Sequence, residues 1–179
     1  MALRKASSYS HRIARPYTRN SRSKQKAYIK VIPFSKIVKF SMGDQASFRN
    51  GKHKFIVSMI SQERVQVRDT ALESGRMHLH KIMEDNSPGF YFIAVKVTPH
   101  HFLRENKSAG GMAGADRIST GMTQSFGQVI GRSAIVSPGS PIFIVSCADE
   151  KTARIARDAL NTIRPKIPAK TRIVFERRE

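Results

Sequence analysis

The sequence predicts an α+β fold in which two helices pack on one face of a mostly antiparallel sheet. Three observations support this prediction. Short runs of β-branched and aromatic residues alternate with turn residues along positions 28–179. Two longer segments repeat apolar residues at helical spacing. Strands both precede and follow these two helices, an order that is typical of the α+β class.

The strands follow from apolar runs of strand length. Apolar residues on both sides of Pro33 predict two short strands within residues 29–40. Residues 55–60 and 90–97 predict two longer strands, the second apolar enough to be covered on both faces. Near the end of the chain, the remaining predicted strands are a pair at residues 129–136 and 142–147, joined by a Pro- and Gly-rich turn, and a closing strand at residues 172–176.

Two helices are predicted between these strands. The first runs from about Gln62 to Asp85, with Ser61 as its N-cap and an Asn-Ser-Pro-Gly stop after it. Asp149 opens the second helix and Pro165 ends it. The apolar residues that carry the helical period are Val65, Leu72 and Leu79 in the first helix and Ala153, Ala156, Leu160 and Ile163 in the second.

Charge gives the main indication of function. The 179 residues include 32 Lys and Arg against 13 Asp and Glu, for a formal net charge of +19. The first 43 residues contain eleven Lys and Arg, and the first acidic residue is Asp44. Like charges at this density repel one another unless a polyanion offsets them. The composition therefore indicates nucleic acid as the partner.

Residues 1–27 have no sustained hydrophobic period, and we predict an extended basic arm ahead of a single α+β domain at 28–179. Met1–Lys26 also has the Arg- and Ser-rich composition of an organellar transit peptide. Pro16 and the lack of an apolar helical stripe favour a retained arm instead. The single Cys147 excludes an intramolecular disulfide and a multi-cysteine zinc site. Since no apolar run is long enough to cross a bilayer, no membrane association is expected.

A long loop at residues 98–128 interrupts the pattern of strands and helices. About thirty residues there show neither period, and five of the eleven glycines fall between positions 110 and 127. Loops of this length tend to be functional or disordered. Glycine lets the backbone approach a surface closely, and nearby basic side chains can meet phosphate oxygens. We expect a functional loop, and a flexible surface loop without a partner is the alternative.

The order of residues in this loop resembles a known family. Ala115-Asp116-Arg117 is followed after three residues by Gly121-Met122, and then by Phe126-Gly127. Together with residues 104–107 and 15–19, this order resembles the large-subunit ribosomal protein family L-ten-e, the archaeal and eukaryotic branch of universal large-subunit protein sixteen. The chain departs from the family at Thr123, where the family has Arg, and at Gln128-Val129, where it has a Lys-Pro-like pair.

The resemblance implies a structural protein bound to large-subunit rRNA in the cytoplasm, beside the path along which aminoacyl-tRNA enters. It implies tRNA, neighbouring ribosomal proteins and assembly factors as further partners, with no cofactor and no small-molecule substrate. The rRNA-binding residues that follow from the charge and the resemblance are Arg4, Lys5, Arg12, Arg15, Tyr17, Arg19, Arg22, Lys24, Lys26, Lys30 and Arg132. The loop residues expected to face tRNA and the peptidyl transferase region are His101, Arg104, Lys107, Gly110, Gly111, Met112, Gly114, Asp116, Arg117 and Met122.

An RNA-modifying or RNA-cleaving enzyme with a basic cleft is the alternative function, and a DNA-architectural protein is a weaker one. An enzyme would need an acid/base pair or a metal site, and the best carboxylate pair is Glu105 and Asp116. Each has a basic neighbour, so a local ion pair or a turn-capping role is expected. His100-His101 and the pair His78 and His80 have no ligand set around them. We therefore predict neither a catalytic site nor a metal site.

Overall fold

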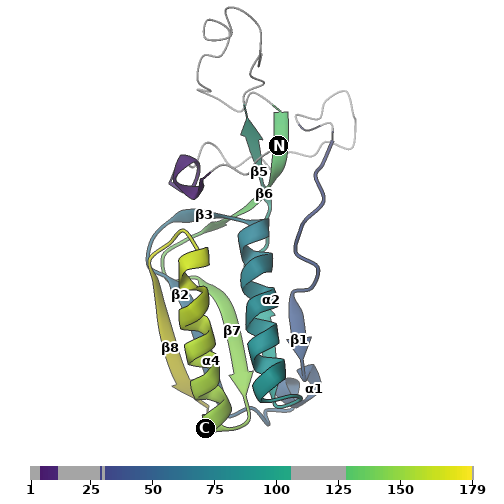
Figure 1. Cartoon of the computed structure of the whole chain (residues 1–179), viewed down its shortest axis with the longest axis vertical. Helices are drawn as coiled ribbons and strands as arrows, with labels where there is room; N and C mark the ends of the chain where they lie inside the picture. The colour runs from purple at the N-terminus through teal and green to yellow at the C-terminus, as the bar shows by residue number, and fades with distance from the viewer. Residues whose placement is uncertain (1–4, 12–28, 30, 106–127, 179) are drawn as a thin grey trace, which may run out of the picture.

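The computed structural model describes residues 5–11, 29, 31–105 and 128–178 (Figure 1). Their strands form two antiparallel sheets. The five-stranded sheet has the order β1 (Ser41–Gly43), β4 (Tyr91–Val95), β7 (Pro141–Cys147), β2 (Phe55–Ser61) and β8 (Thr171–Arg177). The three-stranded sheet has the order β3 (Val65–Arg68), β6 (Gln128–Val136) and β5 (His101–Glu105).

Two long helices lie side by side on one face of the five-stranded sheet (Figure 1). These are α2 (Asp69–Asn86) and α4 (Glu150–Ile163). A short helix, α1 (Gln45–Arg49), follows β1, and two 3₁₀ turns are η1 (Ala6–Ser8) and η2 (Arg164–Lys166). This arrangement confirms the predicted α+β class.

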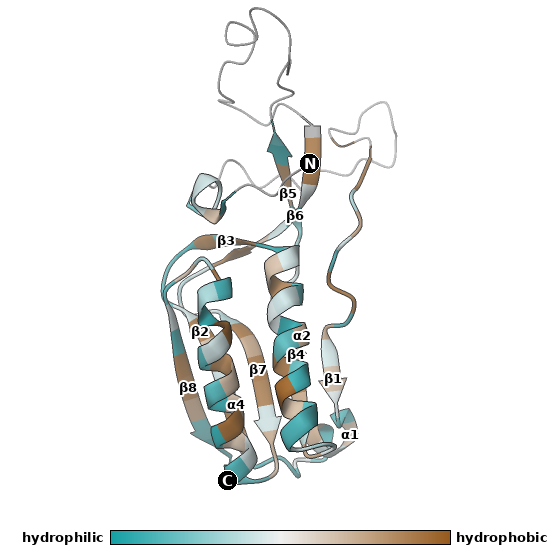
Figure 2. Ribbon diagram, viewed as in Figure 1, coloured by the Kyte–Doolittle hydropathy of each residue, from teal (hydrophilic) through white to brown (hydrophobic). Residues whose placement is uncertain are grey.

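The core fills the space between the two helices and the five-stranded sheet. Alternate residues of the central strands point toward the helices, including Val57 and Met59 of β2 and Phe143 of β7, and all three are fully buried. Helix α2 approaches the sheet closely at Gly75, where a Cβ atom would lie 3.0 Å from the Phe143 ring. Figure 2 shows the resulting pattern, with β7 hydrophobic along most of its length and polar residues along the helices.

Helix α2 corresponds to the first predicted helix. It begins at Asp69, and the predicted start near Gln62 is wrong. Residues 65–68 form β3 instead, because Val65 and Val67 are buried while their backbones pair with β6. Arg68 is the N-cap residue, without a side-chain capping bond. Ser61, the predicted N-cap, ends β2, and its hydroxyl donates a hydrogen bond to the Glu63 carbonyl.

Two strand predictions and one loop prediction also need correction. Among the described residues of 29–40, none lies in a strand, and β1 begins at Ser41. Strands form at the predicted residues 129–136 and 142–147, as β6 and β7, but they are not paired with each other, because β6 lies between β3 and β5 whereas β7 lies between β4 and β2. Residues 101–105, predicted as loop, form β5. The strands predicted at 55–60, 90–97 and 172–176 are confirmed as β2, β4 and β8, and Asp149 is the N-cap of α4 as predicted.

Candidate nucleic-acid interface

The three-stranded sheet holds both ends of the long loop. Strand β5 precedes the loop and β6 follows it, and the two strands pair antiparallel. Their last paired residues before the loop are Glu105 and Gln128, with an irregularity in the register between Leu103 and Arg104. The chain therefore leaves and re-enters the described fold at adjacent points on one edge of the molecule (Figure 1).

The same sheet holds the described part of the basic arm. The backbone N–H of Gln66 on β3 donates to the Ser10 carbonyl at 2.8 Å, and its side-chain Nε2 donates to the Tyr9 carbonyl at 3.0 Å. Ser133 of β6 donates to the Gln66 Oε1 atom at 3.1 Å, so the buried Gln66 amide joins the arm to the middle strand. The Arg68 Cζ atom lies 4.5 Å from the centroid of the Tyr9 ring. Burial raises the pKa of Tyr9, which stays a neutral phenol.

Arg132, a predicted rRNA-binding residue, links β6 to the segment ahead of β1. Its Nε donates to the Pro33 carbonyl at 2.7 Å, and its Cζ lies 5.5 Å from the centroid of the Phe102 ring. Both contacts orient the guanidinium within the three-stranded sheet. Arg132 therefore has a structural role in addition to any contact with RNA.

His101 and Arg104 lie in β5, so their predicted place in the loop is corrected. His101 is opposite Ser133 and is buried. Burial lowers the pKa of His101, and the neighbouring Arg104 lowers it further. The imidazole is therefore neutral near pH 7, and its buried Nδ1 atom has no hydrogen-bond partner among the described residues. A neutral, buried ring does not act as a cationic ligand for phosphate.

Lys5 is described and exposed beside η1. The other predicted contacts lie outside the described residues: Arg4, Arg12, Arg15, Tyr17, Arg19, Arg22, Lys24, Lys26 and Lys30 of the arm, and Lys107, Gly110, Gly111, Met112, Gly114, Asp116, Arg117 and Met122 of the loop.

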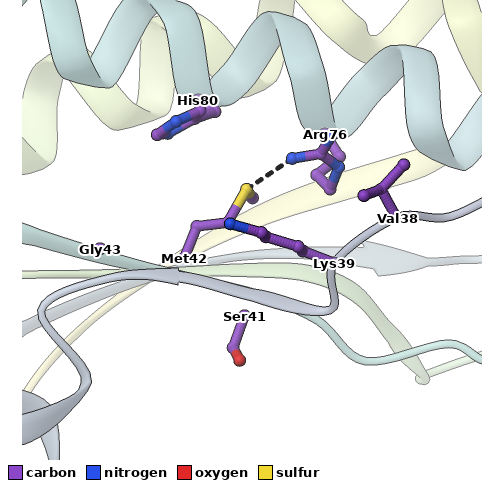
Figure 3. Close-up of a pocket in the computed structure, with 7 residues that line it drawn as sticks. All are labelled: Val38, Lys39, Ser41, Met42, Gly43, Arg76 and His80. Carbon is purple, nitrogen blue, oxygen red and sulfur yellow. Dashed lines mark hydrogen bonds between the residues drawn. The ribbon is translucent and has the colours of Figure 1, made fainter.

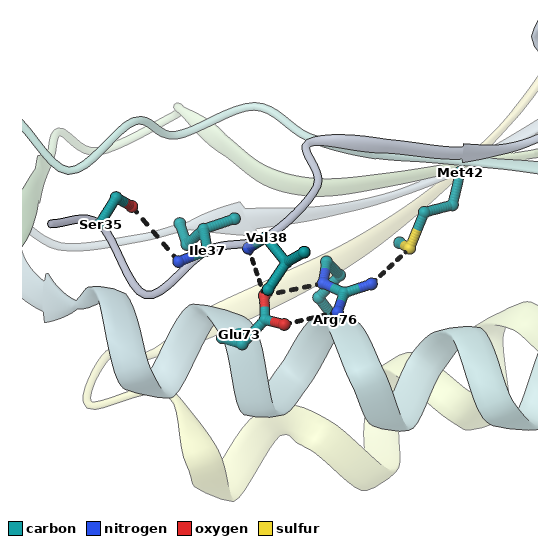
Figure 4. Close-up of polar contacts among 6 residues, drawn as sticks. All are labelled: Ser35, Ile37, Val38, Met42, Glu73 and Arg76. Carbon is teal, nitrogen blue, oxygen red and sulfur yellow. Dashed lines mark hydrogen bonds and ion pairs between the residues drawn. The ribbon is translucent and has the colours of Figure 1, made fainter.

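The segment at residues 31–40 is a surface feature that was not predicted from the sequence. Two of its backbone N–H groups donate to carboxylates of α2. Lys36 N–H donates to Asp69 at 3.0 Å. Val38 N–H donates to Glu73 at 3.3 Å (Figure 4). Apolar side chains of this segment are strongly exposed: Phe34 is 91% exposed and Val38 74%. An exposed aromatic ring such as Phe34, close to exposed lysines, is a group on which the bases of a single-stranded nucleic acid can stack. Pro33 was the signal in the sequence that this segment is not a strand, because proline has no backbone N–H to donate to a neighbouring strand.

Glu73 organises the next turn of α2. It accepts two hydrogen bonds from Arg76, from Nε at 2.8 Å and from Nη2 at 2.5 Å. These bonds lower the pKa of Glu73, and the hydrogen bond to Glu73 raises that of Arg76. Both side chains are nearly buried, so the two residues form a well-ordered ion pair without net charge beneath residue 38.

Within the part of the chain that the structure describes, no group of three His, Cys, Asp or Glu side chains is placed to hold a metal ion. The helices in that part are too short or too polar to span a bilayer. Cys147 is buried in the core, and burial raises the pKa of its thiol to about 12.

Comparison with known proteins agrees with the family resemblance. The model of the family described as ribosomal protein L16p/L10e matches residues 15–174. The chain is 38% identical over 177 residues to the large ribosomal subunit protein uL16 of Staphylothermus marinus, covering 98% of this chain and 95% of that protein. The uL16 protein of Hyperthermus butylicus is 40% identical over 159 residues, which are 88% of this chain and 82% of that protein. The uL16 protein of Thermofilum pendens is 37% identical over 177 residues, which are 98% of this chain and 98% of that protein. The chain therefore belongs to the ribosomal protein L16p/L10e family, a family of structural ribosomal proteins and not of enzymes.

Proposed function

We propose that this chain is a structural rRNA-binding protein of the large ribosomal subunit, beside the path along which aminoacyl-tRNA enters. Residues 1–27 are its basic arm, residues 28–179 its α+β domain, and the loop within 98–128 is directed at the peptidyl transferase region. Its partners are large-subunit rRNA, tRNA, neighbouring ribosomal proteins and assembly factors. The relatives are named as large ribosomal subunit proteins, which supports the assignment of this chain to the large subunit.

The main support is the convergence of two predicted RNA-binding segments on one small sheet. Tyr9 and Ser10 of the arm bond to β3, while β5 and β6 hold both ends of the loop. A rigid sheet at the base of the two segments fixes where each begins. Positioning of this kind suits a protein that shapes RNA and needs no catalytic group of its own.

The loop is tested by trimming it within assembled subunits. Deletion of Ser108–Ala115 is expected to leave the fold and subunit binding unchanged, because the β5–β6 ladder lies outside the deletion. Accommodation of tRNA is expected to slow. The measurement compares co-sedimentation with large subunits, and the rate of peptide synthesis, for trimmed and full-length chains. A wild-type rate of peptide synthesis from subunits carrying the trimmed chain would contradict the role proposed for the loop.

A further inference from the structure

A pocket of about 470 Å³ lies between α2 and the chain leading into β1. Arg76 and His80 reach it from the helix, whereas Val38, Lys39 and Met42 line it from the opposite side (Figure 3). The Ser41 hydroxyl points away from the helix. The pocket therefore presents the ion-paired Arg76 guanidinium on one side, the Lys39 ammonium on the other, and apolar side chains at Val38 and Met42.

Arg76 is held in place at this pocket by its ion pair with Glu73, which offsets most of its charge. The residue is only 8% exposed, and Glu73 holds its guanidinium through Nε and Nη2. The remaining nitrogen, Nη1, points toward the Met42 Sδ atom at 2.7 Å (Figure 3). A thioether is a weak acceptor. An anionic oxygen at this position would accept a much stronger, charge-assisted hydrogen bond from Nη1.

Two further groups complete the lining. Lys39 is exposed and lines the pocket. The His80 ring is held by a hydrogen bond between its Nδ1 atom and the Tyr91 hydroxyl at 2.8 Å. The hydroxyl donates its proton to Glu84 and so accepts from Nδ1. The His80 ring and the Met42 thioether offer flat and apolar contacts next to the two cations.

We propose that this pocket binds one nucleotide of the RNA, with its phosphate on Arg76 and Lys39 and its base against Met42, Val38 and His80. The inference rests on the proposed function and names a site for it outside the arm and the loop. The volume lies within the ~300–1,000 Å³ of small-molecule pockets, and a bare phosphate would leave most of it empty. The Arg76 Nη1 donor and the Lys39 ammonium suit the phosphate of a nucleotide, and the His80 ring with its apolar neighbours suits the base.

The test measures binding of the full chain to deproteinised large-subunit rRNA. Lys39→Gln is expected to weaken binding three- to tenfold. The matched control, Lys81→Gln, removes an exposed lysine from α2 that does not line the pocket, and a smaller effect is expected. Adenosine 5′-monophosphate is expected to shift the amide resonances of Lys39 and Met42 at concentrations where inorganic phosphate does not.

A photo-crosslinking residue at Val38 separates RNA from protein as the occupant in assembled subunits. Cross-linking to rRNA is expected from position 38 and not from Lys151 on the exposed side of α4. Equal losses for the two lysine variants, no response to the nucleotide, or cross-links from position 38 to protein would overturn the pocket and leave the proposed function intact. A wild-type chain that does not bind rRNA would overturn both.

Discussion

His101 and His53 both place an imidazole in the interior, where the charged form is disfavoured. Burial is the main cause that lowers the pKa of each from its ordinary value of 6.5, with Arg104 adding to the effect at His101 and Asp44 opposing it at His53. Below pH 6.5 the unfolded chain takes up protons that the folded chain does not. The contribution of these two neutral histidines to the free energy of unfolding is therefore fully present above pH 6.5, and it is lost as the pH falls through their folded pKa values.

His101→Phe tests this linkage. The variant keeps a ring of similar size and removes the titration, so the free energy of unfolding is expected to fall less steeply between pH 7 and pH 5. Each suppressed proton contributes at most about 1.4 kcal/mol per pH unit. Urea unfolding at several pH values measures how steeply the free energy of unfolding depends on pH. Part of this dependence is expected to remain in the variant, because His53 still titrates. An unchanged slope would show that His101 takes up its proton equally in the folded and unfolded chain, and so that burial does not lower its pKa.

Gly43 is a position where only glycine fits. Its φ is 85°, and a Cβ atom would lie 2.2 Å from the Tyr91 carbonyl oxygen. Gly51 has a similar φ of 72°, but a Cβ atom there would have nothing within 4 Å. The pair separates backbone strain from a steric clash between β1 and β4.

Gly51→Ala is expected to cost about 1 kcal/mol of stability, from the left-handed conformation alone. Gly43→Ala is expected to cost about 1–3 kcal/mol more, because the chain must move to relieve the clash. The difference in urea midpoints measures the clash. Equal losses in the two variants would mean that β1 is not held closely against β4.

At the scale of elements, Asp69 joins the start of α2 to the segment ahead of β1. Its Oδ2 accepts from Lys36 N–H at 3.0 Å and its Oδ1 from Thr70 N–H at 2.8 Å. Asp69→Ala leaves the Lys36 donor without its acceptor, and a loss of about 1–3 kcal/mol is expected. Amide exchange at Lys36 is expected to accelerate.

The control for Asp69 is Asp85→Ala, near the end of the same helix. Asp85 is exposed, and removal of a negative charge near a helix C-terminus is neutral or slightly stabilising. If Asp85→Ala destabilises the protein as much as Asp69→Ala, the contact with Lys36 contributes nothing specific.

Local patterns predicted the elements that depend on local sequence. The apolar runs of β2, β4 and β8 and the amphipathic face of α4 were found because a strand or helix shows its period within a few residues. The error at β3 came from Val65, which fits the seven-residue helical spacing and a strand equally well. The division into two sheets depends on which strands pair, as with β6 and β3, and that choice is made by contacts between residues far apart in the chain.

The candidate site was predictable to a different degree. The charge of the arm and the glycine-rich loop are visible in composition. The anchoring of Tyr9 and Ser10 by Gln66, and the pocket around Arg76, are not, because each joins segments more than thirty residues apart. A buried glutamine and a buried arginine have no distinct pattern in a single sequence.

At the scale of the whole molecule, the arm and the loop leave the same three-stranded sheet, while the helices and the larger sheet extend away from it (Figure 1). The net charge of +19 makes binding to a polyanion strongly dependent on salt. Deletion of Met1–Arg22 is expected to weaken rRNA binding and to reduce this dependence. Such a deletion also removes Tyr9 and Ser10, which bond to the buried Gln66. Substitution of Arg12, Arg15, Arg19 and Arg22 by Gln keeps that anchor and removes only charge.

The most direct test is a titration of large-subunit rRNA with the full chain and with this four-arginine variant at increasing salt. With on the order of 6–10 phosphates neutralised, the affinity of the full chain is expected to fall ~10³–10⁵-fold between about 50 and 200 mM salt. The slope of the variant is expected to be smaller by about 3. An affinity for rRNA that is insensitive to salt, or a slope unchanged by the loss of four arginines, would contradict the account.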